Sequence, residues 1–166
     1  MALIVEDGSG VTDADSYVTL AYADAYILAM GYTTPDWSAL TDAQKESCIL
    51  RAMSFIEALN YKGTKADQDY SLEWPRVGVI DRNGYALDND FIPEQLKKAL
   101  VECAFREQTL GTLQGDLDGA SNIKSLKAGS LALEYFEGRI ENDPVFQIID
   151  GLLKGLVDDW TTVVRT

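Results

Sequence analysis

Apolar residues recur at helical spacing in several separate segments of the chain. The first helix is predicted to follow Thr19, which can cap a helix, and to end at Gly31, a common residue just past a helix end. The second is predicted over 41–59, where Thr41 and Gln44 have the spacing of a capping box. The apolar stripes of these two helices are Leu20, Ala23, Ile27 and Met30, and Ile49, Ala52, Met53, Ile56 and Leu59.

Two further helices are predicted in the second half of the chain. One begins at Pro93, because proline is favoured at the first helical position, and stops at Gly111. The other begins at Pro144, and its apolar face continues to Trp160. Gly155, and Gly151 before it, would let another backbone come close to this last helix.

Extended segments are fewer and shorter. Residues 3–5 are predicted to form a short strand. Asn83-Gly84 predicts a type I′ hairpin turn with arms near 78–82 and 85–88. Alternating apolar residues at 131–136 predict a strand that is apolar on both faces and needs neighbouring strands.

Together these elements predict a mainly α protein. It is a small helical bundle of three to four helices with a short β-hairpin and a C-terminal strand-plus-helix arm. Residues 1–111 would form the helical core, and residues 112–166 a turn-rich flexible connector followed by the strand and the amphipathic helix, as part of the same functional unit. That last helix suits a partner's surface as well as its own bundle, so both positions remain open.

Composition narrows the chemistry. The sequence has no histidine, which excludes Ser-His-Asp and Cys-His catalysis and histidine metal sites. Its 14 basic and 27 acidic side chains give a net charge of −13, which disfavours tight non-specific binding to nucleic acid or to anionic membranes. No segment approaches the roughly 20 apolar residues of a membrane span. Cys48 and Cys103 are predicted to be small buried apolar residues in a reducing compartment, although one disulfide bridge remains open.

No catalytic, metal-binding or cofactor-binding residue can be assigned from the sequence. The glycines at 8 and 10 follow neither a Walker nor a Rossmann pattern and predict a turn. The acidic residues of 81–90 have the wrong spacing for an EF-hand loop. Adjacent carboxylates arise by chance in so acidic a chain, so we expect that the protein is not an enzyme. A carboxylate-based enzyme stays a third alternative, after the two functions described below.

One segment combines aromatic and basic side chains, as single-stranded nucleic acid requires, but acidic residues interrupt it. We expect its aromatic rings to pack the loop against the helices. Within it, Pro75 restricts Trp74 to an extended backbone and holds the indole near Arg76, whose guanidinium suits a carboxylate of the same or a neighbouring chain. The segment's aromatic and basic residues are Tyr61, Lys62, Lys65, Tyr70, Trp74 and Arg76.

Several short motifs, in this order along the chain, resemble the head-tail connector, or adaptor, proteins of tailed bacteriophages, a family also labelled DnaT-like single-stranded-DNA-binding proteins. The matching segments are 2–10 (Ala-Leu-Ile-Val-Glu-Asp-Gly-Ser-Gly), 14–18 (Ala-Asp-Ser-Tyr-Val), 72–76 (Leu-Glu-Trp-Pro-Arg), 92–93 (Ile-Pro) and 127–135 (Lys-Ala-Gly-Ser-Leu-Ala-Leu-Glu-Tyr).

The resemblance implies a structural virion protein in the phage neck, synthesised in the host cytoplasm. It would form a ring, typically of twelve copies, below the portal and join the capsid to the next neck or tail-completion protein. Genomic DNA would pass through its acidic lumen, and no membrane or cofactor would be involved. The alternative is a replication-associated DnaT-like module that binds single-stranded DNA. The residues that the resemblance places at protein interfaces are Trp74, Pro75, Arg76, Leu131, Leu133, Tyr135, Val145, Ile148, Ile149, Leu152, Leu156 and Trp160.

Overall fold

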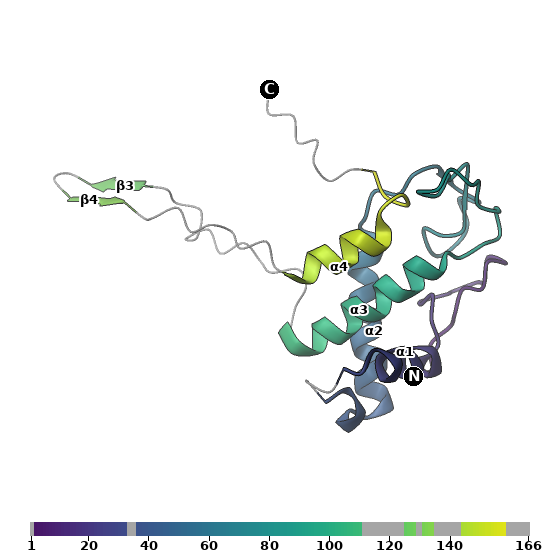
Figure 1. Cartoon of the computed structure of the whole chain (residues 1–166), viewed down its shortest axis with the longest axis horizontal. Coiled ribbons are helices and arrows are strands. Elements are labelled where there is room, and N and C mark those ends of the chain that lie inside the picture. The colour runs from purple at the N-terminus through teal and green to yellow at the C-terminus, as the bar shows by residue number, and fades with distance from the viewer. Residues whose placement is uncertain (1, 33–35, 111–124, 129–130, 135–143, 159–166) are drawn as a thin grey trace.

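The fold is known from a computed structural model that describes residues 2–32, 36–110, 125–128, 131–134 and 144–158 (Figure 1). The prediction of a mainly helical protein with a short antiparallel hairpin is confirmed. The elements, in chain order, are helix α1 (Leu20–Met30), the 3-10 helix η1 (Trp37–Ala39), helix α2 (Asp42–Glu57), strands β1 (Thr64–Lys65) and β2 (Arg76–Val77), helix α3 (Glu94–Leu110), strands β3 (Ser125–Ala128) and β4 (Leu131–Glu134), and helix α4 (Pro144–Leu153).

Local capping explains where the first two helices begin and end. The Thr19 side chain accepts a hydrogen bond from the Tyr22 N–H at 3.1 Å, and Gly31 ends α1 at a φ of 69°. Thr41 and Gln44 form the predicted capping box at the start of α2. These boundaries are readable from sequence because each cap involves residues at most a few positions apart.

Helix α3 is the central element of the bundle. It packs against α1, α2 and α4 (Figure 1), and six of its apolar side chains have no exposed surface. Helix α4 therefore packs on the chain's own bundle and not on the surface of a partner, which were the two positions that the sequence left open. Among the side chains that the structure describes, the apolar ones with no exposed surface are Leu96, Ala99, Leu100, Val101, Cys103 and Ala104 on α3, and Ile149 and Leu153 on α4.

The last helix is shorter than predicted. It ends at Leu153, and the chain then turns at Gly155, where φ is +98°. The turn brings Leu156 and Val157 back into the core. Their backbone pairs with the segment after α2: the Lys62 N–H donates to the Leu156 carbonyl at 2.9 Å. The continuous apolar pattern therefore spans a helix and a turn, because both bury their apolar side chains.

The turn after β2 also differs in detail from the prediction. The Gly84 N–H donates to the Asp81 carbonyl at 3.0 Å, and Ile80 bridges Ala86. Gly84 has a φ of +90°, whereas Asn83 keeps a negative φ, which excludes a type I′ turn. The Asp81 carboxylate accepts hydrogen bonds from the N–H groups of Asn83 and Tyr85 at 2.8 and 2.9 Å, and this favours the observed turn.

The short strands were only partly predicted. The ladder of β1 with β2 has two residue pairs and was not predicted. Strand β4 pairs with β3 of the same chain, and Leu133 lies opposite Leu126. The predicted strand at 3–5 is reduced to a single bridge between Val5 and Ser16. None of the helices in the described residues has both the length and the apolar character of a membrane span.

Candidate functional site

The Trp-Pro-Arg segment lies inside the protein. Trp74 has no exposed surface and contacts the edge of the Tyr61 ring, with the two centroids 5.7 Å apart. The Trp74–Pro75 peptide bond is cis. The expectation that the aromatic side chains pack the loop against the helices is confirmed for Trp74. The Trp74 ring therefore has no free face on which a nucleobase could stack.

Arg76 is also internal, and its guanidinium binds backbone carbonyls. It donates to the carbonyls of Lys62 at 2.9 Å and Gly63 at 3.0 Å, and to the Glu73 carboxylate at 2.6 Å. Its charge is satisfied within its own chain. The side chain therefore joins the loop after α2 to β2, and it has little surface to offer a partner.

The other predicted interface residues lie in three kinds of environment. Ile149 and Leu156 are buried, Leu152 is half-buried, and Ile148 is 43% exposed on α4. Leu131 and Leu133 lie on β4, and Val145 lies on α4. Tyr135 and Trp160 lie outside the described residues. Their role in protein contacts stays a prediction.

The buried acidic side chains are satisfied by groups of the same chain. The Glu6 carboxylate accepts hydrogen bonds from the N–H groups of Gly8, Gly10 and Val11 at 2.8–2.9 Å. This internal carboxylate occupies the glycine loop, which agrees with its prediction as a turn. The Glu102 carboxylate, on α3, accepts hydrogen bonds from two tyrosines and forms an ion pair with Arg106.

The described residues contain no group of three or more Cys, Asp or Glu side chains placed to hold a metal ion. Both cysteines are free and buried. Burial raises the pKa of the Cys103 thiol to about 12, so this thiol stays protonated at neutral pH and is a poor nucleophile.

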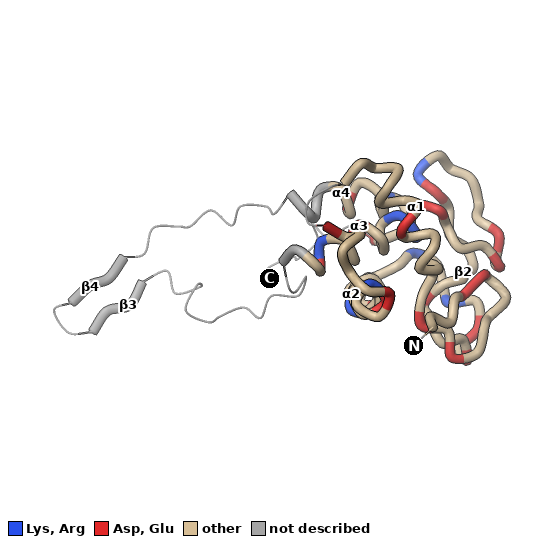
Figure 2. The backbone as a smooth tube through the Cα atoms, turned by 90° about the horizontal axis from the view of Figure 1, so that it is seen from below, with Lys and Arg blue, Asp and Glu red and all other residues tan. Residues whose placement is uncertain are grey.

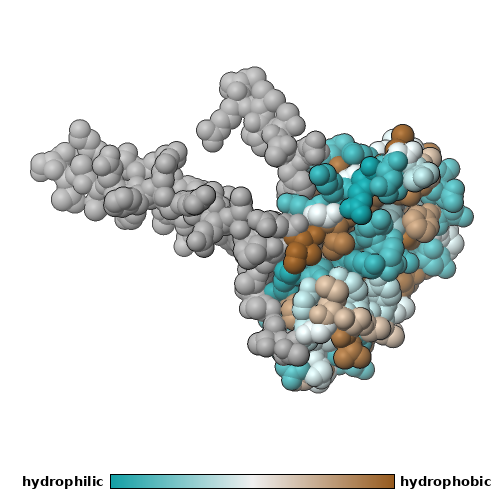
Figure 3. Space-filling view, in the orientation of Figure 1, coloured by the Kyte–Doolittle hydropathy of each residue, from teal (hydrophilic) through white to brown (hydrophobic). Residues whose placement is uncertain are grey.

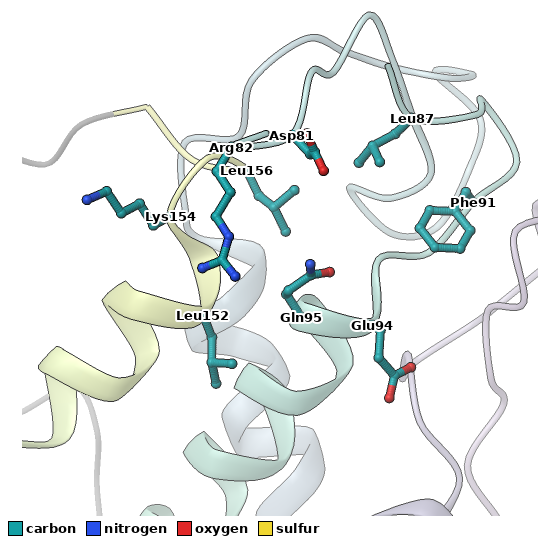
Figure 4. A pocket seen from close by; sticks show the side chains of 9 residues that line it. All are labelled: Asp81, Arg82, Leu87, Phe91, Glu94, Gln95, Leu152, Lys154 and Leu156. Carbon is teal, nitrogen blue, oxygen red and sulfur yellow. The ribbon is translucent and has the colours of Figure 1, made fainter. Parts of the chain in front are cut away.

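A pocket of about 310 Å³ lies between the turn after β2, the start of α3 and the end of α4 (Figure 4). Leu87, Phe91 and Leu156 form apolar walls, with Leu152 below. The Gln95 amide and the Asp81 carboxylate point into the space between them. Arg82, Lys154 and Glu94 complete the lining.

Two aromatic rings, one in the pocket lining and one in the adjoining turn, are exposed, unlike the ring of Trp74. Phe91 is 45% exposed, and Tyr85, in the same turn as Asp81 and Arg82, is 72% exposed. These rings are suited to stacking on a planar ligand.

The charges around the pocket are mixed. Among the described residues, the structure shows no ion pair for Arg82 or Lys154, and both side chains are exposed. Asp81 and Glu94 lie on the same walls. Elsewhere the basic positions are scattered among acidic ones rather than gathered on one face (Figure 2). Within the part of the chain that the structure describes, the pocket thus has two cations without an ion-pair partner, in an acidic molecule.

The pocket depends on a close backbone contact. A Cβ atom placed on Gly155 would lie 2.8 Å from the Arg82 nitrogen, so glycine lets the turn after α4 approach the turn after β2. A close approach at this glycine was predicted from the sequence, but the pocket was not. Arg82, Tyr85 and Phe91 carried the available signal, an arginine followed closely by two aromatic residues, but only a hairpin turn was predicted there.

Comparison with known proteins decides the family. No curated protein and no solved structure matches the chain. The family model described as "Putative DnaT-like ssDNA binding protein" matches residues 1–166, the whole chain, and it is not a head-tail connector family. The resemblance to phage connectors was therefore wrong, together with the virion role, the ring and the portal partner that it implied. Trp74, Pro75 and Arg76 of the motif at 72–76 are buried within the chain's own fold, and their role in protein contacts stays a prediction. The chain belongs to the DnaT-like ssDNA-binding protein family.

Proposed function

We propose that this protein is a non-catalytic module that binds single-stranded DNA. The observation that carries the proposal is the match of the DnaT-like ssDNA-binding family over the whole chain. This function is the alternative named under the sequence resemblance, a DnaT-like module that binds single-stranded DNA.

The pocket supports the proposal because it combines the two features that single-stranded nucleic acid requires. Bases stack on exposed aromatic rings, and cationic side chains neutralise the phosphates. Phe91 in the pocket lining provides one ring and the exposed Tyr85, in the turn that carries Arg82, provides another. Arg82 and Lys154 provide the charges. Duplex DNA hides its base faces, so single strands should bind better.

The net charge of −13 sets the expected strength of binding. Two cations neutralise about two phosphates, so the logarithm of the binding constant should fall with the logarithm of salt concentration with a slope of about −1.4. Repulsion between the acidic protein and the DNA weakens binding further. We expect modest affinity that is detectable at low salt.

Fluorescence anisotropy with a labelled oligonucleotide of mixed sequence tests the proposal. The expected result is saturable binding at low salt, weaker binding of the matching duplex, and a slope near −1.4. No saturable binding at low salt, or equal binding of the duplex, would overturn the proposal.

Two substitutions with the same change in net charge test the position of the site. Lys154→Gln removes a pocket cation and should lower the magnitude of the slope by about 0.7. Lys97→Gln is the control, because Lys97 lies outside the pocket and acts electrostatically on Asp7. An equal loss in both variants would place the DNA elsewhere.

A further inference from the structure

The Asp81 carboxylate points into the pocket, between the apolar side chains of Leu87 and Leu156 (Figure 4). The turn holds this carboxylate in place, because the N–H groups of Asn83 and Tyr85 donate to its Oδ1 atom at 2.8 and 2.9 Å. A flat ligand that lies between the apolar side chains would therefore meet the carboxylate with one of its polar edges.

The Asp81 carboxylate can accept further hydrogen bonds but cannot donate one. The N–H group of Tyr85 is the main cause that lowers the pKa of Asp81 below its usual value of 3.8, so the group is ionised at neutral pH. An ionised carboxylate accepts about four hydrogen bonds. The turn uses two at Oδ1, and Oδ2 has one longer contact, 3.3 Å from the Asn83 amide. The Oδ2 atom therefore remains available to a ligand that brings N–H donors.

The four nucleobases differ in what their unpaired edges offer to a carboxylate. Guanine has a ring N–H next to an exocyclic amine, so its donors stand side by side. Adenine and cytosine each have an amine with a ring-nitrogen acceptor beside it, and thymine has a ring N–H between two carbonyl oxygens. The negative charge of Asp81 repels an acceptor that lies beside the donor. Guanine is therefore the base whose edge suits this carboxylate best.

The other polar groups of the pocket do not select among the bases. The Gln95 amide points into the same space, but it both donates and accepts, so it can pair with any of the four bases. The Glu94 carboxylate points away from this space (Figure 4). The two cations, Arg82 and Lys154, suit phosphates, which every nucleotide carries. Selection among the bases therefore depends on Asp81.

We propose that the pocket holds one unstacked nucleobase of a DNA single strand and prefers guanine, whose adjacent N–H donors meet the Asp81 carboxylate. This inference rests on the proposed binding of single-stranded DNA, whose phosphates Arg82 and Lys154 would contact. Given the usual discrimination by a side chain that pairs with a base edge, guanine should bind at least about fivefold more tightly than each of the other three bases.

Short oligonucleotides built from abasic residues with one central base test the inference, because their phosphate charge is constant. The probes carry guanine, adenine, cytosine, thymine or no base, and each competes with a labelled single strand. We expect the guanine probe to bind at least about fivefold more tightly than the other three bases, and the abasic probe to bind most weakly. Equal binding of the four bases, or a preference for another base, would overturn the inference.

A further probe that carries hypoxanthine isolates the contact without any change in the protein. Hypoxanthine is guanine without its exocyclic amine, so the ring N–H and the stacking surface are kept. We expect it to bind at least about threefold more weakly than guanine, because one donor to the carboxylate is lost. Equal binding of guanine and hypoxanthine would show that no acceptor of the pocket meets the amine, and the proposed role of Asp81 would be wrong.

Asp81→Asn tests which residue accepts from the base. The asparagine oxygen can keep the hydrogen bonds from Asn83 and Tyr85, while its amine places donors where Oδ2 accepts. This variant should lose the preference for guanine. Asp88→Asn makes the same change in net charge at an exposed residue outside the pocket lining and should keep the preference. A preference for guanine that survives in Asp81→Asn would contradict the assignment.

The two proposals fail in different ways. If mixed-sequence single strands bind but the probes show no preference for guanine, base reading is wrong and single-strand binding stands. If no single-stranded DNA binds at low salt, both proposals are wrong.

Discussion

At the scale of single residues, buried charges in this protein bind groups of their own chain. Arg76 donates to the carbonyls of Lys62 and Gly63 and to the carboxylate of Glu73, and its guanidinium lies 5.8 Å from the centre of the Tyr61 ring. A planar guanidinium offers five N–H donors in a fixed fork, whereas an ammonium offers three on one atom. The presence of arginine at this position is explained by structure, without a binding partner.

Replacing Arg76 by alanine should therefore destabilise the fold. The substitution leaves the carbonyls and the Glu73 carboxylate without their donor, and we expect a loss of about 3–5 kcal/mol in the free energy of unfolding. Urea unfolding followed by circular dichroism measures it. Arg82→Ala is the matched control at an exposed arginine and should change stability by less than about 0.5 kcal/mol. Similar losses in both variants would contradict the structural role of Arg76.

The titration of Asp81 reports on the turn after β2. Hydrogen bonds from the N–H groups of Tyr85 and Asn83 lower the pKa of its carboxyl below the usual value of 3.8. Because the folded pKa is the lower one, this contribution to stability is present above the unfolded pKa and is lost as the pH falls through the folded value. An NMR titration of the Asp81 carboxyl carbon should give a midpoint below 3.8. A midpoint at or above that value would contradict the turn geometry.

At the scale of elements, the end of α4 shows how a glycine sets a boundary. The apolar pattern continues past Leu153, but the helix stops there because Gly155 turns the backbone at φ +98°. The turn packs directly on the backbone of Arg82. One residue thus ends the helix, returns Leu156 to the core and brings α4 to the pocket.

The two glycines of this region should respond to alanine in opposite directions. Gly155→Ala places a methyl group against the Arg82 backbone at a positive φ and should destabilise the protein by more than about 1 kcal/mol. It should also weaken DNA binding, because the pocket walls separate. Gly151→Ala meets no atom within 4 Å and lies inside α4, so it should stabilise by about 0.5–1 kcal/mol. Thermal unfolding of the pair measures both effects, and equal shifts would contradict this account.

At the scale of the whole molecule, α3 and α4 complete one hydrophobic core. Helix α3 contacts each of the other three helices, and α4 covers one of its sides. On the face shown in Figure 3 the apolar areas are small and separated by hydrophilic ones. Of the α4 side chains that the structure describes, over 148–153, Ile149 and Leu153 are buried and Ile148 is exposed.

Substitutions on the two sides of α4 test this arrangement. Leu153 has no exposed surface, and Leu153→Ala should cost about 2–5 kcal/mol through lost burial and a cavity. Ile148 is 43% exposed on the same helix, and Ile148→Ala should cost about 1 kcal/mol or less. Chemical unfolding compares the two. A small effect at Leu153 would mean that α4 does not belong to the core.

Features that depend on residues close together in the chain were predictable. The caps at Thr19 and Thr41 and the ends at Gly31 and Leu110 follow from side chains and glycines within one helical turn of the boundary. The turn at Asp81 was predicted in position but not in type, because a carboxylate two residues away competes with the intrinsic preference of Asn-Gly.

Features that depend on distant segments were decided by the tertiary structure. The sequence alone determined the helical class, the positions of α1, α2 and α3, and the absence of histidine chemistry. Packing decided that Trp74 and Arg76 are internal and that α4 covers its own core. The pocket also arose only there, because its walls come from the turn after β2, the start of α3 and the end of α4. Because these three segments lie far apart along the chain, no local sequence pattern could predict that they meet and form a pocket.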